Sequence, residues 1–249
     1  MKNAEQNWFG YSKAADATDK TARVRDVFAS VADNYDVMND LMSFGMHRLW
    51  KRTFVRQVAP QAGEAILDVA GGTGDIAFLM HRKVPQASIT VCDINPDMLR
   101  VGQARAIDKG MMDAFTWVEG NAESLPFEAR QFDVLTIAFG LRNVARIDDA
   151  LADFARVLKP GGRFLCLEFA PVDKPVLKQA YDAYSFTLLP FLGRTIANDA
   201  DAYRYLAESI RQFPEPETLA KRIRAAGFAA VSHTALAGGI VNIHEGVRI

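Results

Sequence analysis

The stretch from Ile66 to Asp75 constrains this chain most, because an apolar run with an acid near its end leads directly into clustered glycines. That order predicts a buried strand, a tight loop and the start of a helix. Glycine suits such a loop because a residue without Cβ adopts positive φ at little cost and lets the backbone lie against a ligand. The helix start adds free N–H groups. The stretch therefore predicts a site for a nucleotide-like cofactor.

Two kinds of cofactor fit this loop. In one interpretation, Gly72, Gly74 and Ala77 form the fingerprint of dinucleotide-binding proteins, in which a pyrophosphate sits on the helix N-terminus. In the other, Asp68, Ala70, Gly72 and Gly74 form the S-adenosylmethionine loop of Rossmann-like methyltransferases. Asp68 favours the second interpretation, because adenosylmethionine carries an ammonium and a sulfonium that a carboxylate attracts.

The composition narrows the choice of partners. With 249 residues, 49% of them hydrophobic, we expect one decorated domain. The 29 Lys and Arg balance 30 Asp and Glu, so no net field gathers DNA or RNA, and nucleic acid is not an expected partner. No pair of histidines has metal-ligand spacing, so we expect no metal.

The cysteines and the apolar runs suggest where the protein works. Cys92 and Cys166 each lie in a run typical of a buried strand, without a second thiol nearby, which indicates core thiols in a reducing cytoplasm. No apolar run approaches the roughly 18 residues of a spanning helix. We therefore expect a soluble, cytoplasmic protein.

Strand and helix patterns alternate through the middle of the chain. Strands are predicted near 65–70, 88–93, 115–119, 132–138 and 163–169, with helices from 75, over 96–109 and over 147–158. One more helix and two strands joined at Gly238 and Gly239 follow near the end. This alternation predicts an α/β, Rossmann-like, doubly wound fold whose seven-stranded sheet is mostly parallel with an antiparallel C-terminal strand.

The same patterns divide the chain into four parts. Residues 1–58 are predicted to form an N-terminal helical segment or lid, and residues 59–171 the cofactor-binding core. Residues 172–211 interrupt the alternation with aromatic-rich helical stretches, which indicates an insertion on the substrate side. Residues 212–249 are predicted to complete the core.

Polar residues follow the next two predicted strands. Ligands of open α/β sheets bind beyond the carboxyl ends of the strands, and Asp93 stands there about twenty residues past the glycine loop, where a carboxylate accepts ribose hydroxyls. In methyltransferases the loop after the third strand holds the adenine. Asn121 offers it a carbonyl oxygen and Ala122 a backbone N–H. A dehydrogenase has no need of this combination, so it favours methyl transfer over hydride transfer.

Four segments that span nearly the whole chain resemble the ubiquinone/menaquinone biosynthesis C-methyltransferase family. They are residues 35–40 together with 43–50, residues 67–75, residues 139–144 and residues 238–244. The resemblance implies transfer of a methyl group from S-adenosyl-L-methionine to a ring carbon of a polyprenylated quinol. The implied substrates are demethylmenaquinol and 2-methoxy-6-polyprenyl-1,4-benzoquinol.

The resemblance and the glycine loop together assign the cofactor to seven residues: Asp68, Gly72, Thr73, Gly74, Asp93, Asn121 and Ala122. Two positions depart from the family's common pattern. Ala138 stands where the family often has serine, so a hydroxyl contact is lost there, and Asn121 stands where aspartate is also common. Both asparagine and aspartate accept from the adenine amine, so neither departure changes the assignment.

The implied chemistry requires an activated ring. A quinol carbon becomes a good nucleophile when a hydroxyl loses its proton, and the protein must align the ring and stabilise the phenolate. Arg142 and Asn143 follow the fourth strand, where we expect the ring. Arginine is a poor base, so we assign Arg142 to electrostatic stabilisation, with an ordered water taking the proton. Tyr35 is expected to point into the same site from the N-terminal helices.

The expected partners follow from the lipid tail of the quinol. They are a membrane surface at the inner face or a complex of quinone-biosynthesis enzymes, together with a second copy of the chain in a homodimer. Three alternatives stay open at this point. They are a methyltransferase for another lipid-like molecule, such as a sterol or a phospholipid amine, an NAD-dependent oxidoreductase, and a binding subunit that keeps the cofactor site but transfers nothing.

Overall fold

The structure is a computed structural model. It describes residues 8–9, 12–13, 16, 19–20, 22–24, 43, 45–171, 205 and 208–249. Tyr35 and most of the expected insertion lie outside these residues. The division of the chain into four parts therefore stays a prediction.

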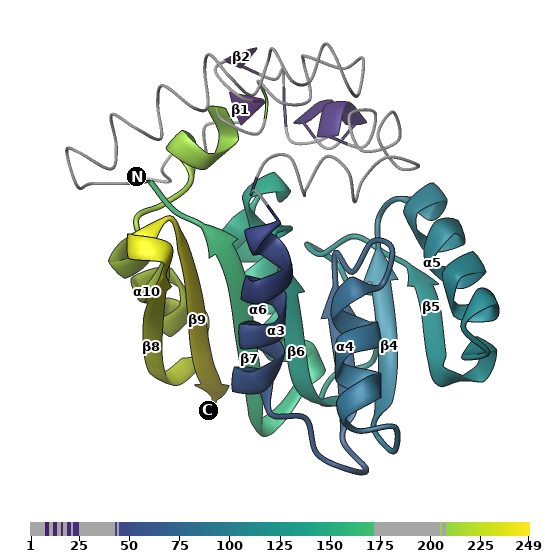
Figure 1. The fold of residues 1–249 in the computed structure, drawn as a ribbon. Helices are drawn as coiled ribbons and strands as arrows, with labels where there is room; N and C mark the ends of the chain where they lie inside the picture. The colour runs from purple at the N-terminus through teal and green to yellow at the C-terminus, as the bar shows by residue number, and fades with distance from the viewer. Residues whose placement is uncertain are drawn as a thin grey trace.

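A seven-stranded sheet forms the middle layer of the molecule (Figure 1). Its strands, in spatial order, are β5 (Phe115–Glu119), β4 (Ser88–Asp93), β3 (Ala65–Val69), β6 (Phe132–Ala138), β7 (Leu158–Phe169), β9 (Val241–Arg248) and β8 (Phe228–Leu236). The pairs from β5 to β7 are parallel, whereas β9 runs antiparallel to both β7 and β8. The expected fold, with one reversed strand near the C-terminus, is confirmed. A short antiparallel pair, β1 (Trp8–Phe9) and β2 (Ser12–Lys13), lies apart from this sheet.

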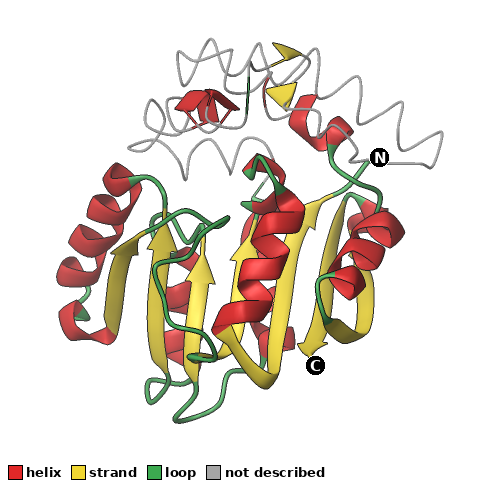
Figure 2. Cartoon of the chain, turned by 180° about the vertical axis from the view of Figure 1, so that it is seen from behind, coloured by secondary structure: helices red, strands yellow, loops and turns green. Residues whose placement is uncertain are grey.

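Helices cover both faces of the sheet (Figures 1 and 2). The helices that the structure describes in full are α3 (Met46–Val58), α4 (Asp75–Lys83), α5 (Pro96–Asp108), α6 (Ile147–Val157) and α10 (Pro216–Ala225), with single turns at Met112–Ala114, Leu141–Asn143 and Ala237–Gly239. Apolar side chains of α3, α4 and α5 pack in one core, and those of α6 and α10 pack in a second core. None of the helices in the described part of the chain has the length and apolarity that a bilayer-spanning helix requires.

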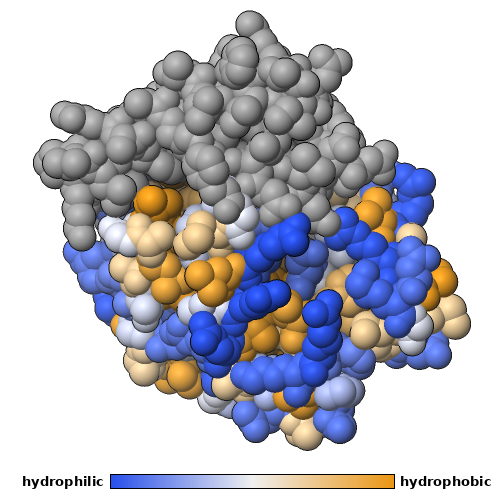
Figure 3. All heavy atoms as spheres, viewed as in Figure 1, coloured by the Kyte–Doolittle hydropathy of each residue, from blue (hydrophilic) through white to orange (hydrophobic). Residues whose placement is uncertain are grey.

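The strands are apolar on both faces because helices bury both. In β3, Ile66 belongs to the core under α3 and α4, while the next residue, Leu67, belongs to the core under α6, and neither side chain is exposed. Figure 3 shows that the outer faces of α3 and α4 carry mostly hydrophilic side chains. The helices are therefore amphipathic covers of an apolar sheet.

Local signals place the start of α5 as expected. The side chain of Asn95 accepts a hydrogen bond from the Asp97 N–H at 2.9 Å, and Pro96 is the first helical residue. The start of β7 is earlier than the sequence predicts. Leu158 already pairs with Phe132, and the ladder shifts register before Arg163, so the intervening Lys-Pro-Gly-Gly is an irregular part of the strand.

The order of the strands positions the site. From β3 the chain moves outward to β4 and β5, and then returns to place β6 on the other side of β3. Loops that leave β3 and β6 therefore diverge to opposite faces, which leaves a crevice at the carboxyl edge. Asp68 near the end of β3 and Asp93 at the end of β4 lie at this edge.

The two cores predict which apolar side chains stabilise the fold. Leu151 on α6 is fully buried, whereas Leu49 on α3 is 51% exposed. Leu151→Ala should lower the free energy of unfolding by about 2–5 kcal/mol, because it leaves a cavity. The same change at Leu49 should cost less than about 1 kcal/mol. Urea unfolding of both variants measures the difference, and equal losses would contradict this description of the core.

Candidate active site

A pocket of about 1070 Å³, part of it open to solvent, lies at the carboxyl edge of β3, β4 and β6. Six of the seven predicted cofactor residues line it: Asp68, Gly72, Thr73, Asp93, Asn121 and Ala122. Asn143 lines it as well, whereas Gly74 and Arg142 do not. The structure therefore brings together groups that stand up to 75 positions apart, since Asp68 and Asn143 share one cavity.

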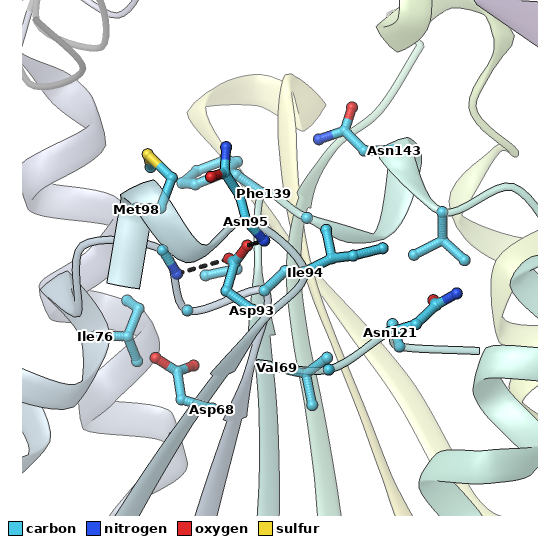
Figure 4. A pocket seen from close by; sticks show the side chains of 18 of the residues that line it. Asp68, Val69, Ile76, Asp93, Ile94, Asn95, Met98, Asn121, Phe139 and Asn143 are labelled. Atoms are coloured by element: carbon cyan, nitrogen blue, oxygen red, sulfur yellow. Dashed lines mark hydrogen bonds between the residues drawn. The ribbon is translucent and has the colours of Figure 1, made fainter. Parts of the chain in front are cut away.

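Asp93 is held at the centre of the pocket by two backbone groups (Figure 4). Its Oδ2 accepts a hydrogen bond from the Gly72 N–H at 2.8 Å, and its Oδ1 accepts one from the Asn95 N–H at 2.8 Å. Burial raises the pKa of this carboxyl to about 6, although these hydrogen bonds oppose the shift. Each carboxylate oxygen retains a second lone pair. The side chain therefore keeps capacity to accept further hydrogen bonds, which is the property that the ribose prediction requires.

Asp68 is a buried acid, and one of its two oxygens accepts no hydrogen bond from the described residues. Its Oδ1 accepts a hydrogen bond from the Thr136 hydroxyl at 2.7 Å, while its Oδ2 accepts none from the described residues. Burial, with a smaller contribution from the carboxylates of Asp93 and Asp75, raises its pKa to about 7, although the hydrogen bond from Thr136 opposes the shift. A buried acceptor without a donor is unfavourable in the free protein. A cationic ligand that donates hydrogen bonds would satisfy it.

The glycine loop curves around these carboxylates. Gly72 has φ +53°, and a Cβ there would lie 3.1 Å from Met98 Cε at the pocket wall. Gly74 has φ +84°, and a Cβ there would lie 2.8 Å from Trp117 Cη2, so it shapes the loop by close packing rather than by lining the pocket. Between them, the Thr73 hydroxyl accepts a hydrogen bond from Arg105 Nη1 at 3.0 Å.

The loop after β5 presents the two groups that the sequence predicts for an adenine. Asn121 Oδ1 accepts a hydrogen bond from the Glu123 N–H at 3.0 Å and retains a lone pair, and the Ala122 N–H donates to none of the described residues. Sequence reasoning missed Glu123. Its Oε1 accepts from the N–H groups of Ala145 and Arg146, both at 3.1 Å, and this anchors the loop to the start of α6.

Arg142 is a buried member of an ion pair. Its Nη1 lies 3.1 Å from Glu168 Oε1, and its backbone N–H donates to Glu168 Oε2 at 3.2 Å. Nη1 also donates to the carbonyl of Phe139, and the guanidinium lies 5.7 Å from the centre of the Phe169 ring. Sequence reasoning missed Glu168, although an acid inside the apolar run of β7 is a signal that a buried partner exists.

Asn143 connects the pocket to a residue of the predicted insertion. Its Oδ1 accepts a hydrogen bond from the Tyr205 hydroxyl at 2.9 Å, and burial raises the pKa of Tyr205. Tyr35, the third predicted catalytic residue, lies outside the described residues. Tyr205 thus supplies an aromatic hydroxyl near Asn143 that sequence reasoning did not single out.

Phe139 forms an aromatic wall of the pocket (Figure 4). Its φ of +58° is rare for a bulky residue and costs about 1–3 kcal/mol. Its N–H donates to the Leu167 carbonyl at 2.7 Å, and its ring lies 4.8 Å from that of Phe169 and 6.5 Å from that of Trp50. These contacts hold the strained residue with its ring at the cavity, which no sequence signal predicted.

Comparison with known proteins identifies the family. The model of the ubiE/COQ5 methyltransferase family matches residues 16–248. The chain belongs to this family. The ubiquinone/menaquinone biosynthesis C-methyltransferase UbiE of Brucella abortus (strain S19) is 53% identical over 244 residues, which are 97% of this chain and 90% of the relative. The protein of that name from Nitrobacter hamburgensis is 55% identical over 238 residues, or 93% of each chain.

A solved structure agrees with the fold. An S-adenosylmethionine-dependent methyltransferase of Thermotoga maritima has a TM-score of 0.66 and 16% identity, over 91% of this chain and 100% of its own. Membership of the ubiE/COQ5 family confirms the expected family and the methyltransferase activity. Of the two cofactors that fit the glycine loop, S-adenosylmethionine is therefore confirmed over NAD.

The two raised pKa values predict how donor affinity depends on pH. Asp68 and Asp93 become protonated below about pH 7 and about pH 6, which removes negative charge that attracts a cationic ligand. The affinity for adenosylmethionine, measured by calorimetry, should therefore fall as the pH is lowered from about 8 to about 5.5. Asp68→Asn should weaken binding about tenfold at the higher pH and flatten the upper part of the profile.

The control for this prediction is Asp113→Asn, which makes the same chemical change at an exposed residue ahead of β5. It should leave both the affinity and the pH profile as in the unmodified protein. An affinity for adenosylmethionine that stays constant over this pH range would show that the two buried acids do not bind the cation.

Proposed function

We propose that this methyltransferase transfers the methyl group of S-adenosylmethionine to a ring carbon of a polyprenylated quinol, namely demethylmenaquinol or 2-methoxy-6-polyprenyl-1,4-benzoquinol. The observation that carries the proposal is identity of 53% and 55% to UbiE C-methyltransferases of ubiquinone/menaquinone biosynthesis, over nearly the full length of both relatives. The pocket supports it by combining adenosine-type contacts with an aromatic wall.

The donor would be held by the groups at the strand ends. Asp93 would accept hydrogen bonds from the ribose hydroxyls. The side-chain oxygen of Asn121 would accept a hydrogen bond from the adenine amine, and the backbone N–H of Ala122 would donate one to a ring nitrogen. Asp68 Oδ2, which accepts no hydrogen bond from the described residues, would face the cationic part of the donor. When bound, adenosylmethionine supplies a methyl group on a positively charged sulfur.

The quinol ring would lie between Phe139 and Asn143, which line the pocket beside the donor loop. Arg142 would stabilise the phenolate, and its buried pairing with Glu168 would hold the guanidinium next to Phe139 and Asn143. The Nε–H of Arg142 donates to no described residue, so one donor is left for this purpose. An ordered water would take the proton, because arginine stays protonated. Tyr35 is proposed to contribute to the same site.

The lipid tail suggests where the reaction takes place. We propose that the protein works in the cytoplasm at the inner face of a membrane, alone or as a homodimer, in contact with other enzymes of quinone biosynthesis. Met46 and Leu49 on α3 are 40% and 51% exposed, and they offer apolar side chains for such contact. Flotation with lipid vesicles tests the proposal, and no association with or without quinol would contradict it.

The redox state of the substrate provides the direct test of the reaction. Protein supplied with isotopically labelled adenosylmethionine should place the label on a ring carbon of reduced demethylmenaquinol and none on the oxidised quinone, because only the quinol forms an electron-rich phenolate. Mass spectrometry of the product locates the label. Asp93→Asn should abolish labelling, since an amide cannot accept both ribose hydroxyls. Label on oxygen, or equal label on the quinone, would refute the proposal.

A double variant tests the role of the Arg142 charge. Arg142→Gln combined with Glu168→Gln removes both charges without leaving one buried and unpaired. If the guanidinium stabilises the phenolate, kcat should fall by about 100-fold or more while the Kd for adenosylmethionine stays within about threefold. Turnover within about threefold of the unmodified enzyme would assign the ion pair to folding alone.

A further inference from the structure

Lys51 is a buried cation that lines the donor pocket, and the proposed reaction assigns no role to it. It lies on α3, is 7% exposed, and lines the pocket together with Asp68 and Asp75. Its Nζ donates to Asp75 Oδ2 at 2.6 Å, where Asp75 is the first residue of α4. Lysine is rarely buried unless it is paired, and Asp75 is a partner that orients this ammonium at the pocket.

The two ends of the pocket carry different chemistry. Figure 4 shows Asn121 and Asn143 on one side of the view and Asp68 and Ile76 on the other. The side with Asn121 holds the groups for an adenine. The other side adjoins the start of α4, where Lys51 binds Asp75. A ligand with its adenine beside Asn121 therefore extends its other end toward Asp68 and Lys51.

The charges at this second end match an amino acid. Asp68 presents an oxygen that accepts no hydrogen bond from the described residues, and Lys51 presents an ammonium. An α-amino acid carries the complementary pair, an ammonium for Asp68 and a carboxylate for Lys51. The N-terminus of α4 adds a favourable field for the carboxylate. The methionine part of adenosylmethionine has this structure.

Asp75 does not prevent Lys51 from binding a second carboxylate. Asp75 is also 3.5 Å from Arg105 Nη1, so two cations share its charge. Burial alone would raise the pKa of Asp75, but Lys51 and Arg105 hold it below its usual value, so Asp75 stays ionised and keeps the Lys51 ammonium oriented. An ammonium has three N–H donors, so it can bridge two carboxylates.

We propose that Lys51 binds the α-carboxylate of the methionine part of adenosylmethionine, and that Asp75 is the positioning residue for its ammonium. The proposal rests on the proposed function, because it takes adenosylmethionine as the ligand. It makes helix α3, which precedes the alternating strands and helices in the sequence, part of the donor site. It also predicts that the protein distinguishes donors by their carboxylate.

A four-way comparison of affinities tests the proposal without measuring turnover. Calorimetry with adenosylmethionine and with decarboxylated adenosylmethionine is done on the unmodified protein and on Lys51→Met. Loss of a charge-assisted hydrogen bond should weaken adenosylmethionine about 10- to 100-fold in Lys51→Met. The decarboxylated donor should bind the unmodified protein weakly, and Lys51→Met should change that affinity by less than about threefold.

Two further variants provide controls. Lys51→Arg keeps a cation and should retain most of the preference for adenosylmethionine over its decarboxylated form. Lys159→Met makes the same change at a lysine that pairs with Asp133 at the opposite edge of the sheet, and it should leave both affinities unchanged.

The outcomes separate this proposal from the function on which it rests. Equal weakening of both donors in Lys51→Met, or no weakening of either, would overturn the role of Lys51 while leaving the donor site intact. If Lys51→Met does not fold, the unmodified protein decides, because equal affinity for the two donors would overturn the proposal. An unmodified protein that binds neither sulfonium compound would overturn the proposed function as well.

Discussion

The buried carboxylate of Asp93 is the interaction on which the rest of the site depends. One oxygen accepts a hydrogen bond from the Gly72 N–H and the other accepts one from the Asn95 N–H, so a single side chain links the glycine loop to the turn that begins α5. Asn95 in turn caps that helix through the Asp97 N–H. The same group is the proposed acceptor of the ribose hydroxyls of the donor. In the proposed complex, loop shape, helix start and donor binding are therefore coupled through one acid at the end of β4.

A second buried carboxyl group, that of Asp68, adds negative charge at this edge of the sheet. Asp68 lies near the end of the neighbouring strand, and the charge of Asp93 helps to raise its pKa. One of its oxygens accepts no hydrogen bond from the described residues. A ligand with positive charge relieves both conditions, whereas the pyrophosphate of a dinucleotide would aggravate them. The chemistry of the site thus agrees with membership of a methyltransferase family.

The sequence predicts the features that follow from strand order and misses those that depend on tertiary packing. Asp93 and Asn121 were predicted because parallel strands place their carboxyl ends at one edge. Arg142 was predicted near the site, but its partner Glu168 stands 26 positions away on β7, and only packing shows that they pair. The left-handed backbone of Phe139 was also missed, because a bulky side chain gives no local sign of positive φ.

A crystal structure of the protein with bound S-adenosylmethionine would show whether Asp93 binds the ribose of the donor. We expect the ribose hydroxyls within hydrogen-bond distance of Asp93, the adenine beside Asn121 and Ala122, and the methionine part between Asp68 and Lys51. A donor bound with its ribose turned away from Asp93, or bound outside this pocket, would contradict this expectation.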